Sequence, residues 1–438
     1  MRSRVPVVVA IFAAALVPAL ARAAVHGTRA TAVVSRNANG PSGGGTFSQD
    51  GRRVSYFAFS STASNLVGGD TNGRSDVFLM KRSGGQSGLD GPLTRISVSS
   101  GGSQANGDSS NPSVDGDSRH TPHCVAFQST ATNLDPRDAS PDWDIYLRNL
   151  RSGRTRLVST DAPTDAVDPV VDGGCRIVTY DSGGTVFVRS LRSSHSVPIA
   201  AGDQPDQQTN GKGVAYVRGG QVYYQAFKRA RGNVVRQGPE RLVSAGLQGP
   251  GNGTSSHPSV SDNGDYVAFE STATNLCTGL CRGVSTDENG PVSDIFRRTM
   301  NGNAPSHDQM EMASYSAGAQ AQGNGPSNDP VISGAGQFIV FDSASTNLRP
   351  SAGIPLSAAD PNGPTRDVFV WNFRPDRGYG NVSRESRPGA TGAFTAPSVA
   401  PSISSHGNFI AFTSSATGEL TNARTGEPNV LMRFLGGA

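Results

Sequence analysis

The chain has 438 residues, of which 54 are glycine and 28 are proline. Its 38 basic and 35 acidic residues give a formal net charge of +3 at pH 7. The first 23 residues hold three of the arginines and no acid, so the remainder is formally neutral. It therefore lacks the basic surplus that a nucleic-acid or anionic-membrane partner normally requires.

The N-terminus has the pattern of a secretory signal peptide over residues 1–23. The basic stretch MRSR is followed by an apolar run over residues 5–20 and by the small-residue signature ARA, which ends at Ala23. Two prolines interrupt the run, and it is short for a membrane span, so an uncleaved anchor is the less favoured alternative. We expect cleavage near Ala23 and a single mature domain, residues 24–438, that is secreted, periplasmic or at the cell surface.

A ten-residue segment occurs twice almost unchanged, as VAFQSTATNL from Val125 and as VAFESTATNL from Val267. Aligning the chain on this core finds five more copies, which begin at Phe57, Ile177, Val214, Ile339 and Ile410. A catalytic site needs each of its groups once, whereas a repeat of this kind is typical of a fold built from equal units.

Each core copy lies among other recurring segments. A segment with a proline and a glycine turn precedes it, as in PSVDGD from Pro112, and an apolar segment follows it, as in DIYLR from Asp144. A third apolar segment, as in TRLVS from Thr155, completes the unit. Four short strands per unit and no long helical periodicity predict an all-β fold, a β-propeller of seven four-stranded blades. Six blades are the alternative, if the degenerate copies at Ile177 and Val214 form one irregular blade.

The first and last units complement each other. The last unit ends with NVLMRFLGGA, from Asn429, and has no fourth strand. The segment TRATAVVSRNANG at residues 28–40 is similar to TRISVSSGGSQANG at residues 94–107, which supplies a fourth strand. We therefore expect the N-terminal strand to complete the last blade and close the ring.

The repeat pattern P-x-[IVS]-S-x-x-G-x-[VI]-A-F-x-S…D-[VI]-[FY] resembles the TolB-like, WD-type β-propeller repeat of exported bacterial proteins, over essentially the whole mature chain. Similar repeats in that family form ring-shaped scaffolds that bind proteins, so the resemblance implies a propeller fold and a binding role. TolB has six blades and a separate N-terminal α/β domain, which this chain does not match. The role of TolB in the cell envelope is therefore not expected for this chain.

The four cysteines of an exported chain are expected to form disulfides. Cys277 and Cys281 flank one loop, Cys124 opens the core strand of the second unit, and Cys175 lies at the matching turn of the third. We predict the pairs Cys277–Cys281 and Cys124–Cys175. The segment HTPHC, which ends at Cys124, is an alternative metal-binding pattern, but no second Cys/His pair has ligand spacing.

Three loops that follow core strands carry alternating oxygen-bearing side chains: Asp70, Asn72 and Asp76; Asp287, Asn289 and Asp294; and Asp360, Asn362 and Asp367. This pattern resembles the start of a calcium loop, although calcium needs about 6–8 oxygen ligands and the full EF-hand pattern is absent. Asn-Gly and Asp also form turns and cap loop amides. We interpret the loops as turns, keep calcium as the alternative, and expect no other cofactor.

Catalytic motifs are weak. The segment GPSGG from Gly40 matches G-x-S-x-G, but it lacks the preceding strand and the following helix that a nucleophile elbow needs. His257 and His406 lie near the ends of inner strands, and we interpret both as structural. We name no catalytic residue, and the sequence leaves open whether the protein is an enzyme.

Two loops, residues 277–293 and 349–366, are longer than their counterparts and belong to neighbouring units. Long loops on a rigid ring are frequent binding sites, and neutral insertion is the competing explanation. We predict an exported scaffold that binds another protein through these loops. The alternatives are a propeller enzyme or lectin-like module that acts on glycans at a channel mouth, marked by converging carboxylates or histidines, and a calcium-stiffened structural module.

Overall fold

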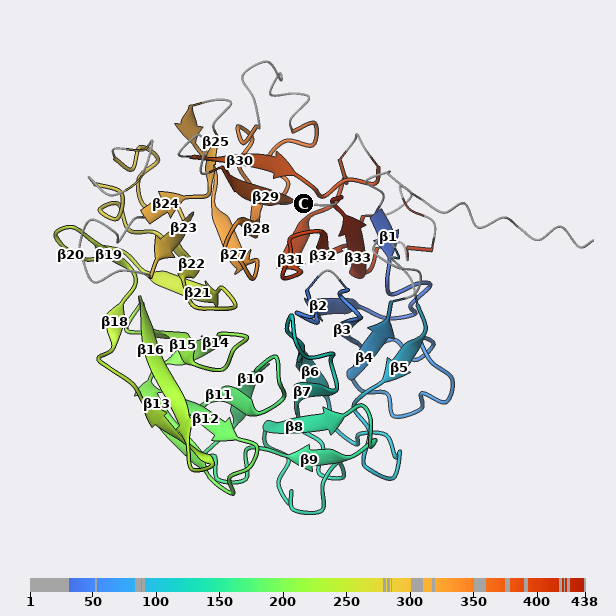
Figure 1. Cartoon of the computed structure of the whole chain (residues 1–438). Helices are drawn as coiled ribbons and strands as arrows, with labels where there is room; N and C mark the ends of the chain where they lie inside the picture. Colours follow the sequence, from blue (N-terminus) through green and yellow to red (C-terminus); the bar gives the residue numbers. More distant parts are fainter. Residues whose placement is uncertain are drawn as a thin grey trace, which may run out of the picture.

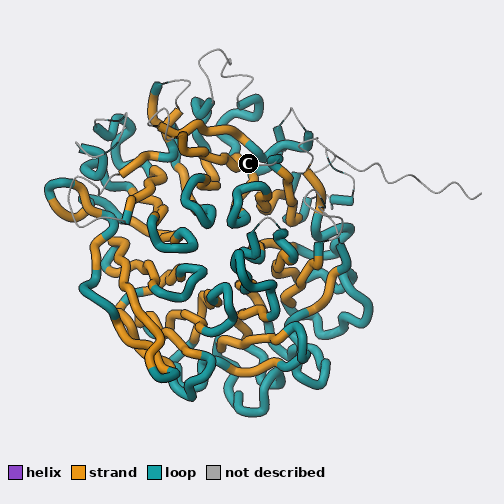
Figure 2. The backbone as a smooth tube through the Cα atoms, viewed as in Figure 1, coloured by secondary structure: helices purple, strands orange, loops and turns teal. Residues whose placement is uncertain are grey.

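A computed structural model describes residues 31–51, 53–82, 88, 91–278, 281, 284, 286–300, 310–316, 320–349, 360–374, 379–389, 393–416, 420, 422–423 and 426–436. In these residues the chain forms strands and loops only, without a helix (Figure 2). The strands form seven four-stranded antiparallel blades around a central axis, as in a β-propeller (Figure 1). The predicted signal peptide lies outside the described residues.

The first four blades follow the chain in order. Blade 1 has β2 (Ser42–Phe47), β3 (Tyr56–Ser61), β4 (Asp76–Lys81) and β5 (Leu93–Arg95). Blade 2 has β6 (Ser109–Val114), β7 (Cys124–Ser129), β8 (Asp144–Asn149) and β9 (Thr155–Leu157). Blade 3 has β10 (Ala166–Val171), β11 (Ile177–Ser182), β12 (Thr185–Ser190) and β13 (Ser196–Ala201). Blade 4 has β14 (Asp203–Gln207), β15 (Gly213–Arg218) and the long β16 (Gln221–Ala230), which pairs with both β17 (Asn233–Arg236) and β18 (Arg241–Leu242).

The other three blades complete the ring. Blade 5 has β21 (Ser255–Val260), β22 (Tyr266–Ser271), β23 (Asp294–Thr299) and β24 (Met310–Met312). Blade 6 has β27 (Ser327–Ile332), β28 (Phe338–Ser343), β29 (Asp367–Arg374) and β30 (Tyr379–Arg384). Blade 7 has β31 (Ser398–Ile403), β32 (Phe409–Ser414), β33 (Asn429–Phe434) and β1 (Thr31–Val33). Two short hairpins, β19 (Ala245–Gly246) with β20 (Gly249–Pro250) and β25 (Tyr315–Ser316) with β26 (Ala321–Gln322), lie between blades.

The prediction of seven blades is confirmed, and the two degenerate core copies form separate blades, 3 and 4. The ring closes as expected, because β1 pairs antiparallel with β33 and places Ala32 opposite Met432. Ser35, just after β1, accepts a hydrogen bond from the Val430 amide at 3.0 Å. The first and last strands of the described chain therefore share one blade (Figure 1).

Alternation of large and small side chains packs the blades against one another. Phe127 shares a buried cluster with Ala58 of the preceding blade, and Ala126 shares another with Tyr180 of the following blade. A large ring from one blade thus fills the space that an alanine leaves on its neighbour, which gives dense packing around the ring. A register slip of one residue would exchange the two sets.

At one end of the inner strands, the turns of successive blades are joined by backbone hydrogen bonds. The Gly116 amide donates to the Gly173 carbonyl at 3.1 Å, and the Gly173 amide donates to Thr209 at 2.8 Å. The series continues from Asn210 to Asp262, from Asp262 to Gly334 and from Gly334 to Ser405. Close approach requires glycine here, since a Cβ on Gly173 would lie 2.6 Å from the Gly116 oxygen.

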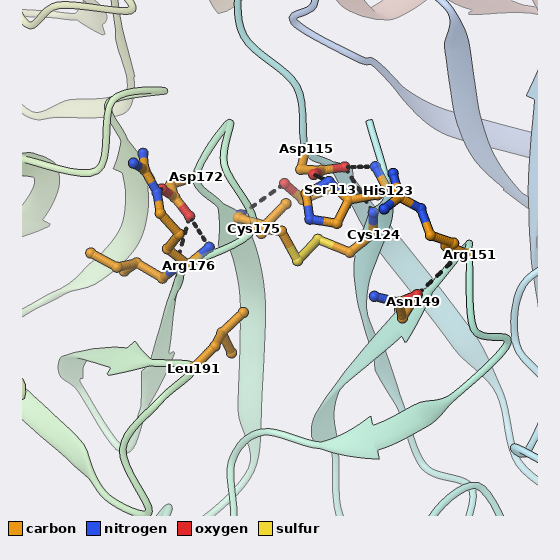
Figure 3. The surroundings of a disulfide bond; sticks show 12 residues. Ser113, Asp115, His123, Cys124, Asn149, Arg151, Asp172, Cys175, Arg176 and Leu191 are labelled. Atoms are coloured by element: carbon orange, nitrogen blue, oxygen red, sulfur yellow. Dashed lines mark hydrogen bonds and ion pairs between the residues drawn. A yellow bond between two sulfur atoms is a disulfide. The ribbon is translucent and has the colours of Figure 1, made fainter. Parts of the chain in front are cut away.

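Both expected disulfides are present. Cys124–Cys175 joins blades 2 and 3 with a Cα–Cα distance of 6.3 Å, beside Leu191 (Figure 3). Cys277–Cys281 closes a small loop after β22, with a Cα–Cα distance of 4.6 Å. The two bonds use all four cysteines.

We expect loss of the first strand to open the ring. A chain that begins at Asn37 lacks the buried Val33 and Val34, whose burial contributes about 1.5–3 kcal/mol each. Its free energy of unfolding should fall by at least about 3 kcal/mol relative to a control that begins at Thr31, measured by urea denaturation. Equal stability of the two chains would contradict closure by β1.

Candidate site on the inner strands

The first strand of each blade lies against the first strands of both neighbours, so these seven strands line the axis of the ring. Each contains a β-bulge. One residue of each bulge has a positive φ, between 45° and 60°: Gly44, Asn111, Asp168, Gln204, His257, Asp329 and Ala400. We call these seven the bulge residues.

Six of the bulge residues are not glycine, and each of those six precedes a proline. The left-handed conformation is uncommon for residues other than glycine, and Asn, Asp and His are enriched among the exceptions. Strained backbone of this kind tends to cluster where a protein binds or reacts. A bulge also re-aims side chains, and the residue at this position varies around the ring, with aspartate in both blade 3 and blade 6.

In blades 2 and 5, the side chain immediately after the core aromatic residue supports the bulge residue of the next blade. The Gln128 side-chain oxygen Oε1 accepts a hydrogen bond from the Asp168 backbone amide at 3.0 Å. The Glu270 carboxylate accepts one from the Asp329 amide at 3.0 Å. Each such bond crosses from one blade to the next, so the polar groups of neighbouring blades are held in fixed relation.

Three of these side chains form a compact cluster between blades 5 and 6, which we call the His257 cluster: His257, Glu270 and Asp329. The His257 Nδ1 lies 2.9 Å from Glu270 Oε1, and its Nε2 lies 3.7 Å from Asp329 Oδ1. Glu270 is buried, whereas the side chains of His257 and Asp329 are 51% and 41% exposed. The cluster therefore has a buried base and an accessible outer side.

The charges of the cluster are coupled. The hydrogen bond that His257 donates to Glu270 raises the pKa of His257, and burial offsets this only in part. Burial alone would raise the pKa of Glu270, but the contact with His257 outweighs it and holds that pKa below its usual value. Burial raises the pKa of Asp329, although His257 opposes the increase. The His257 imidazolium and the Glu270 carboxylate thus stabilise each other, while the Asp329 carboxylate can pair with a further cationic group.

Further carboxylates lie on the inner strands of blades 3 and 4. Burial raises the pKa of Asp168, a hydrogen bond from Asn111 opposes this, and the charge of Asp203 adds to the increase. Burial and the charge of Asp168 raise the pKa of Asp181 to about 6. The charge of His257 opposes the rise in the pKa of Asp168. The inner strand of blade 4, β14, lies directly against β21 of blade 5, so these acidic groups are near the His257 cluster on the inner ring.

The His257 cluster lies at the end of the blades from which the two long loops emerge. In blade 5, Ser256 of β21 pairs with Glu270 of β22, one residue before β22 ends and its loop begins. Blade 6 has the same arrangement, and Arg366 at the end of its loop contacts Asp342 and Asn328. The last residues of both long loops lie near the cluster: the Ser293 hydroxyl donates a hydrogen bond to the Ser327 carbonyl oxygen, and Arg366 contacts Asn328. Other described residues of these loops lie toward the outer edge of the ring, where Cys281 bridges to Met310 of β24 and Arg349 bonds to Ser316.

The loops with a calcium-like pattern have internal partners. Arg95 Nη2 lies 3.4 Å from Asp70 and its Nε lies 3.6 Å from Asp76, and all three side chains are buried. In blade 6, Arg384 lies 3.6 Å from Asp360 and 3.5 Å from Asp367. A guanidinium thus takes the place of a cation in two of the three loops.

The remaining calcium-like loop has no such arginine, because Met312 occupies the corresponding position. Asn289 donates a hydrogen bond to Asp294 at 2.9 Å, and Ser314 donates one at 2.6 Å. Burial raises the pKa of Asp294 to about 7 and that of Asp287 above its usual value. The asparagine presents its amide nitrogen to the carboxylate, as also at Asn72, which favours the interpretation as turns.

The histidines considered in the sequence differ in their surroundings. His406 is exposed at the opposite end of the inner strand of blade 7, near Gly51. His123 lies 2.9 Å from Asp115 and close to the sulfur of Cys175, but that sulfur is in a disulfide (Figure 3). His257 was interpreted as structural, and the sequence did not reveal its two carboxylate partners. Its cluster offers three possible metal-ligating atoms within 4.8 Å of one another.

No protein-family model matches the chain, and no curated protein matches it in sequence. Its structure is similar to TolB from Acinetobacter baumannii, with 11% identity, a TM-score of 0.33 and coverage of 67% of this chain and 60% of that one. A puromycin-hydrolyzing peptidase of Mycobacterium tuberculosis has 12% identity, a TM-score of 0.45 and coverage of 87% and 51%. The β-propeller domain of Cps50 (Swd1) from Myceliophteria thermophila has 9% identity, a TM-score of 0.46 and coverage of 93% and 100%.

The chain thus spans 60% of the TolB chain and 51% of the peptidase chain. The strand pairing itself defines the fold: the chain forms a β-propeller of seven blades. In the part of the chain that the structure describes, no helix is long and apolar enough to cross a membrane.

We expect Arg95→Met to destabilise the protein, since it leaves Asp70 and Asp76 buried without a counter-charge. Breaking a buried pair in this way costs about 3–5 kcal/mol, which urea denaturation would measure. Calcium should not restore the lost stability, and a chelator should leave the melting temperature of the unaltered protein unchanged. A lower melting temperature in calcium-stripped buffer would instead support bound calcium.

We expect the stabilisation by His257 to depend on pH. Because its partners raise the pKa of His257 in the folded state, the stabilisation is present below the unfolded value of about 6.5 and is lost as pH rises through the folded value. His257→Asn, which tolerates the left-handed backbone, should cost up to about 1 kcal/mol at low pH and less at high pH, as expected for an exposed pair. A difference that does not change with pH would contradict this pairing.

Proposed function

We propose that the protein is an exported scaffold that binds another protein on the face of blades 5 and 6, and that the His257 cluster anchors a basic side chain of the partner. The observation that carries this proposal is the convergence of His257, Glu270 and Asp329, from two neighbouring blades, near the last residues of the two long loops.

The charges favour a cationic group. Glu270 is already paired with His257. Asp329 is too far from His257 for a hydrogen bond, since its carboxylate oxygen lies 3.7 Å from Nε2. Its partly exposed carboxylate, together with Asp168 and Asp203 of blades 3 and 4, gives this part of the inner strands an excess of negative charge. A lysine or arginine of a partner would supply the missing positive charge, and the long loops would contact the rest of that partner.

Export is supported by the cysteines and by the N-terminal sequence. Both disulfides would persist in an oxidising compartment such as the periplasm or the extracellular space. The sequence of residues 1–23 has the pattern of a cleaved signal peptide. We propose that the mature protein acts at the cell envelope or outside the cell.

A glycan-directed function is the second candidate, because converging carboxylates on the inner strands are also what a sugar-binding or sugar-cleaving propeller would present. Asp181, whose pKa is raised to about 6 by burial and by Asp168, could hold a proton near neutral pH. In the His257 cluster, however, Glu270 is kept ionised, so the cluster itself has no proton donor of this kind.

The test uses affinity capture from culture supernatant and envelope extracts, in chelator-containing buffer, followed by measurement of Kd for the purified partner. The baits are the mature chain, Asp329→Asn and the control Asp142→Asn, an exposed carboxylate of blade 2 that makes the same charge change. Asparagine keeps the left-handed backbone at residue 329. We expect Asp329→Asn to weaken binding about tenfold and the control to leave it unchanged.

A bait with loops 277–293 and 349–366 shortened to the length of the blade 1 loop should lose the same partner. A partner that binds Asp329→Asn and the shortened bait as tightly as the unaltered protein would contradict the proposal. Capture of polysaccharide by the unaltered protein, with no protein partner, would favour the glycan-directed function.

A further inference from the structure

Four arginines surround a cavity of about 600 Å³ on the outer part of the ring, between blades 2 and 3. Arg156 belongs to β9, the outermost strand of blade 2, and Arg137 to the loop before β8. Arg189 belongs to β12 of blade 3, and Arg192 follows that strand. This arginine pocket is separate from the His257 cluster, which lies on β21 and β22 of blade 5 and β27 of blade 6.

Only two of the four arginines have a carboxylate partner among the residues that the structure describes. Arg137 lies 2.7 Å from Asp135, and Arg189 lies 3.1 Å from Asp161. For Arg156, the described residues provide one hydrogen bond, to the Leu191 carbonyl oxygen at 3.3 Å, and no carboxylate. Two positive charges of the pocket are therefore uncompensated.

The position of Arg156 is unfavourable without a bound anion. Burial lowers the pKa of Arg156, and the charges of Arg189, Arg154 and Arg137 lower it further. Burial likewise lowers the pKa of Arg189, and Arg137 contributes to the decrease. Like charges held together in partly buried positions repel one another, and an anion between them would remove this cost.

The remaining lining fits the rest of a small ligand. Thr160 and Ser193 supply hydroxyl groups, while Leu157 and Leu191 supply apolar surface. A volume of about 600 Å³ is within the usual range of ligand sites and exceeds what one inorganic anion needs. Guanidinium groups that approach from two blades suit the several oxygens of a tetrahedral oxyanion better than the single plane of a carboxylate.

We propose that the arginine pocket binds a phosphate or sulfate group carried by a larger, partly apolar ligand. Arg156 and Arg192 contact the oxyanion, and Leu157 and Leu191 contact the uncharged part of the ligand. The disulfide Cys124–Cys175, which lies beside Leu191, fixes blades 2 and 3 relative to each other and thereby keeps the two halves of the pocket in register (Figure 3).

The first experiment measures the melting temperature and the Kd of the full mature chain for inorganic phosphate, inorganic sulfate and glycerol 3-phosphate, with acetate at matched ionic strength as the control anion. We expect phosphate or sulfate to raise the melting temperature and acetate to leave it unchanged. Arg156→Gln and Arg192→Gln should each weaken binding about tenfold. Arg151→Gln removes the same charge at an exposed residue of the same blade that does not line the pocket, and it should leave binding unchanged.

Arg156→Gln should not lower the melting temperature in the absence of anion, because it relieves repulsion, so loss of binding is distinguishable from loss of folding. Equal binding by the unaltered protein and Arg156→Gln, or equal effects of acetate and phosphate, would overturn the proposal. Vesicles of phosphatidylglycerol and of phosphatidylcholine distinguish the source of the group. Binding to phosphatidylglycerol alone, displaced by inorganic phosphate, identifies a lipid headgroup, whereas binding of glycerol 3-phosphate without vesicle binding identifies a soluble ligand.

Discussion

The antiparallel pairing of β1 with β33 holds the ring closed, and the other contacts between blades depend on it. Each blade buries both faces against its neighbours, so an open ring would expose two apolar faces and an unpaired strand edge. Closure also fixes the first strands around the axis, where the bulge residues lie. The site on the inner strands is therefore a property of the whole ring and of no single blade.

The repeat made most of this fold predictable from sequence. The seven blades and the N-terminal strand that completes blade 7 follow from the spacing of the core copies and from the alternation seen in Val125, Ala126 and Phe127. Both cysteine pairs follow from the positions of the cysteines within the units. The sequence left six blades as an alternative, because the cores of blades 3 and 4 depart from the alanine-phenylalanine pattern. Blade 3 has Thr179-Tyr180 and blade 4 has Ala215-Tyr216 at these positions. The strand pairing shows that they are separate blades.

The candidate site was not predictable in the same way. His257, Glu270 and Asp329 are separated by 13 and by 59 residues in the chain and meet only because two blades lie side by side. A signal was nevertheless present within the repeat. The residue before each inner-strand proline and the residue after each core aromatic vary among the units. These two positions meet where Asp168 contacts Gln128 and where Asp329 contacts Glu270. Variation within a constant repeat can therefore mark the functional position of a propeller.

The calcium-like pattern of aspartates and asparagines in the loops has a structural explanation. Aspartates that begin the third strand, such as Asp294 and Asp367, accept hydrogen bonds from serines on the fourth-strand segment at 2.6 Å, and those serines also accept backbone amides of the third strand. The calcium-like pattern thus recurs because the same strand-to-strand connection recurs. The residues that we propose to be functional, in the His257 cluster and in the arginine pocket, are residues that differ among the repeat units.

The most direct measurement places a photo-crosslinking amino acid at Glu288, an exposed residue of the blade 5 loop, or at His406, exposed at the opposite end of blade 7. Each variant would be produced in the cells that make the protein, and adducts would be identified by mass spectrometry. We expect one discrete protein adduct at Glu288 and none at His406. Adducts of equal yield at both positions, or at His406 alone, would contradict binding on the face of blades 5 and 6.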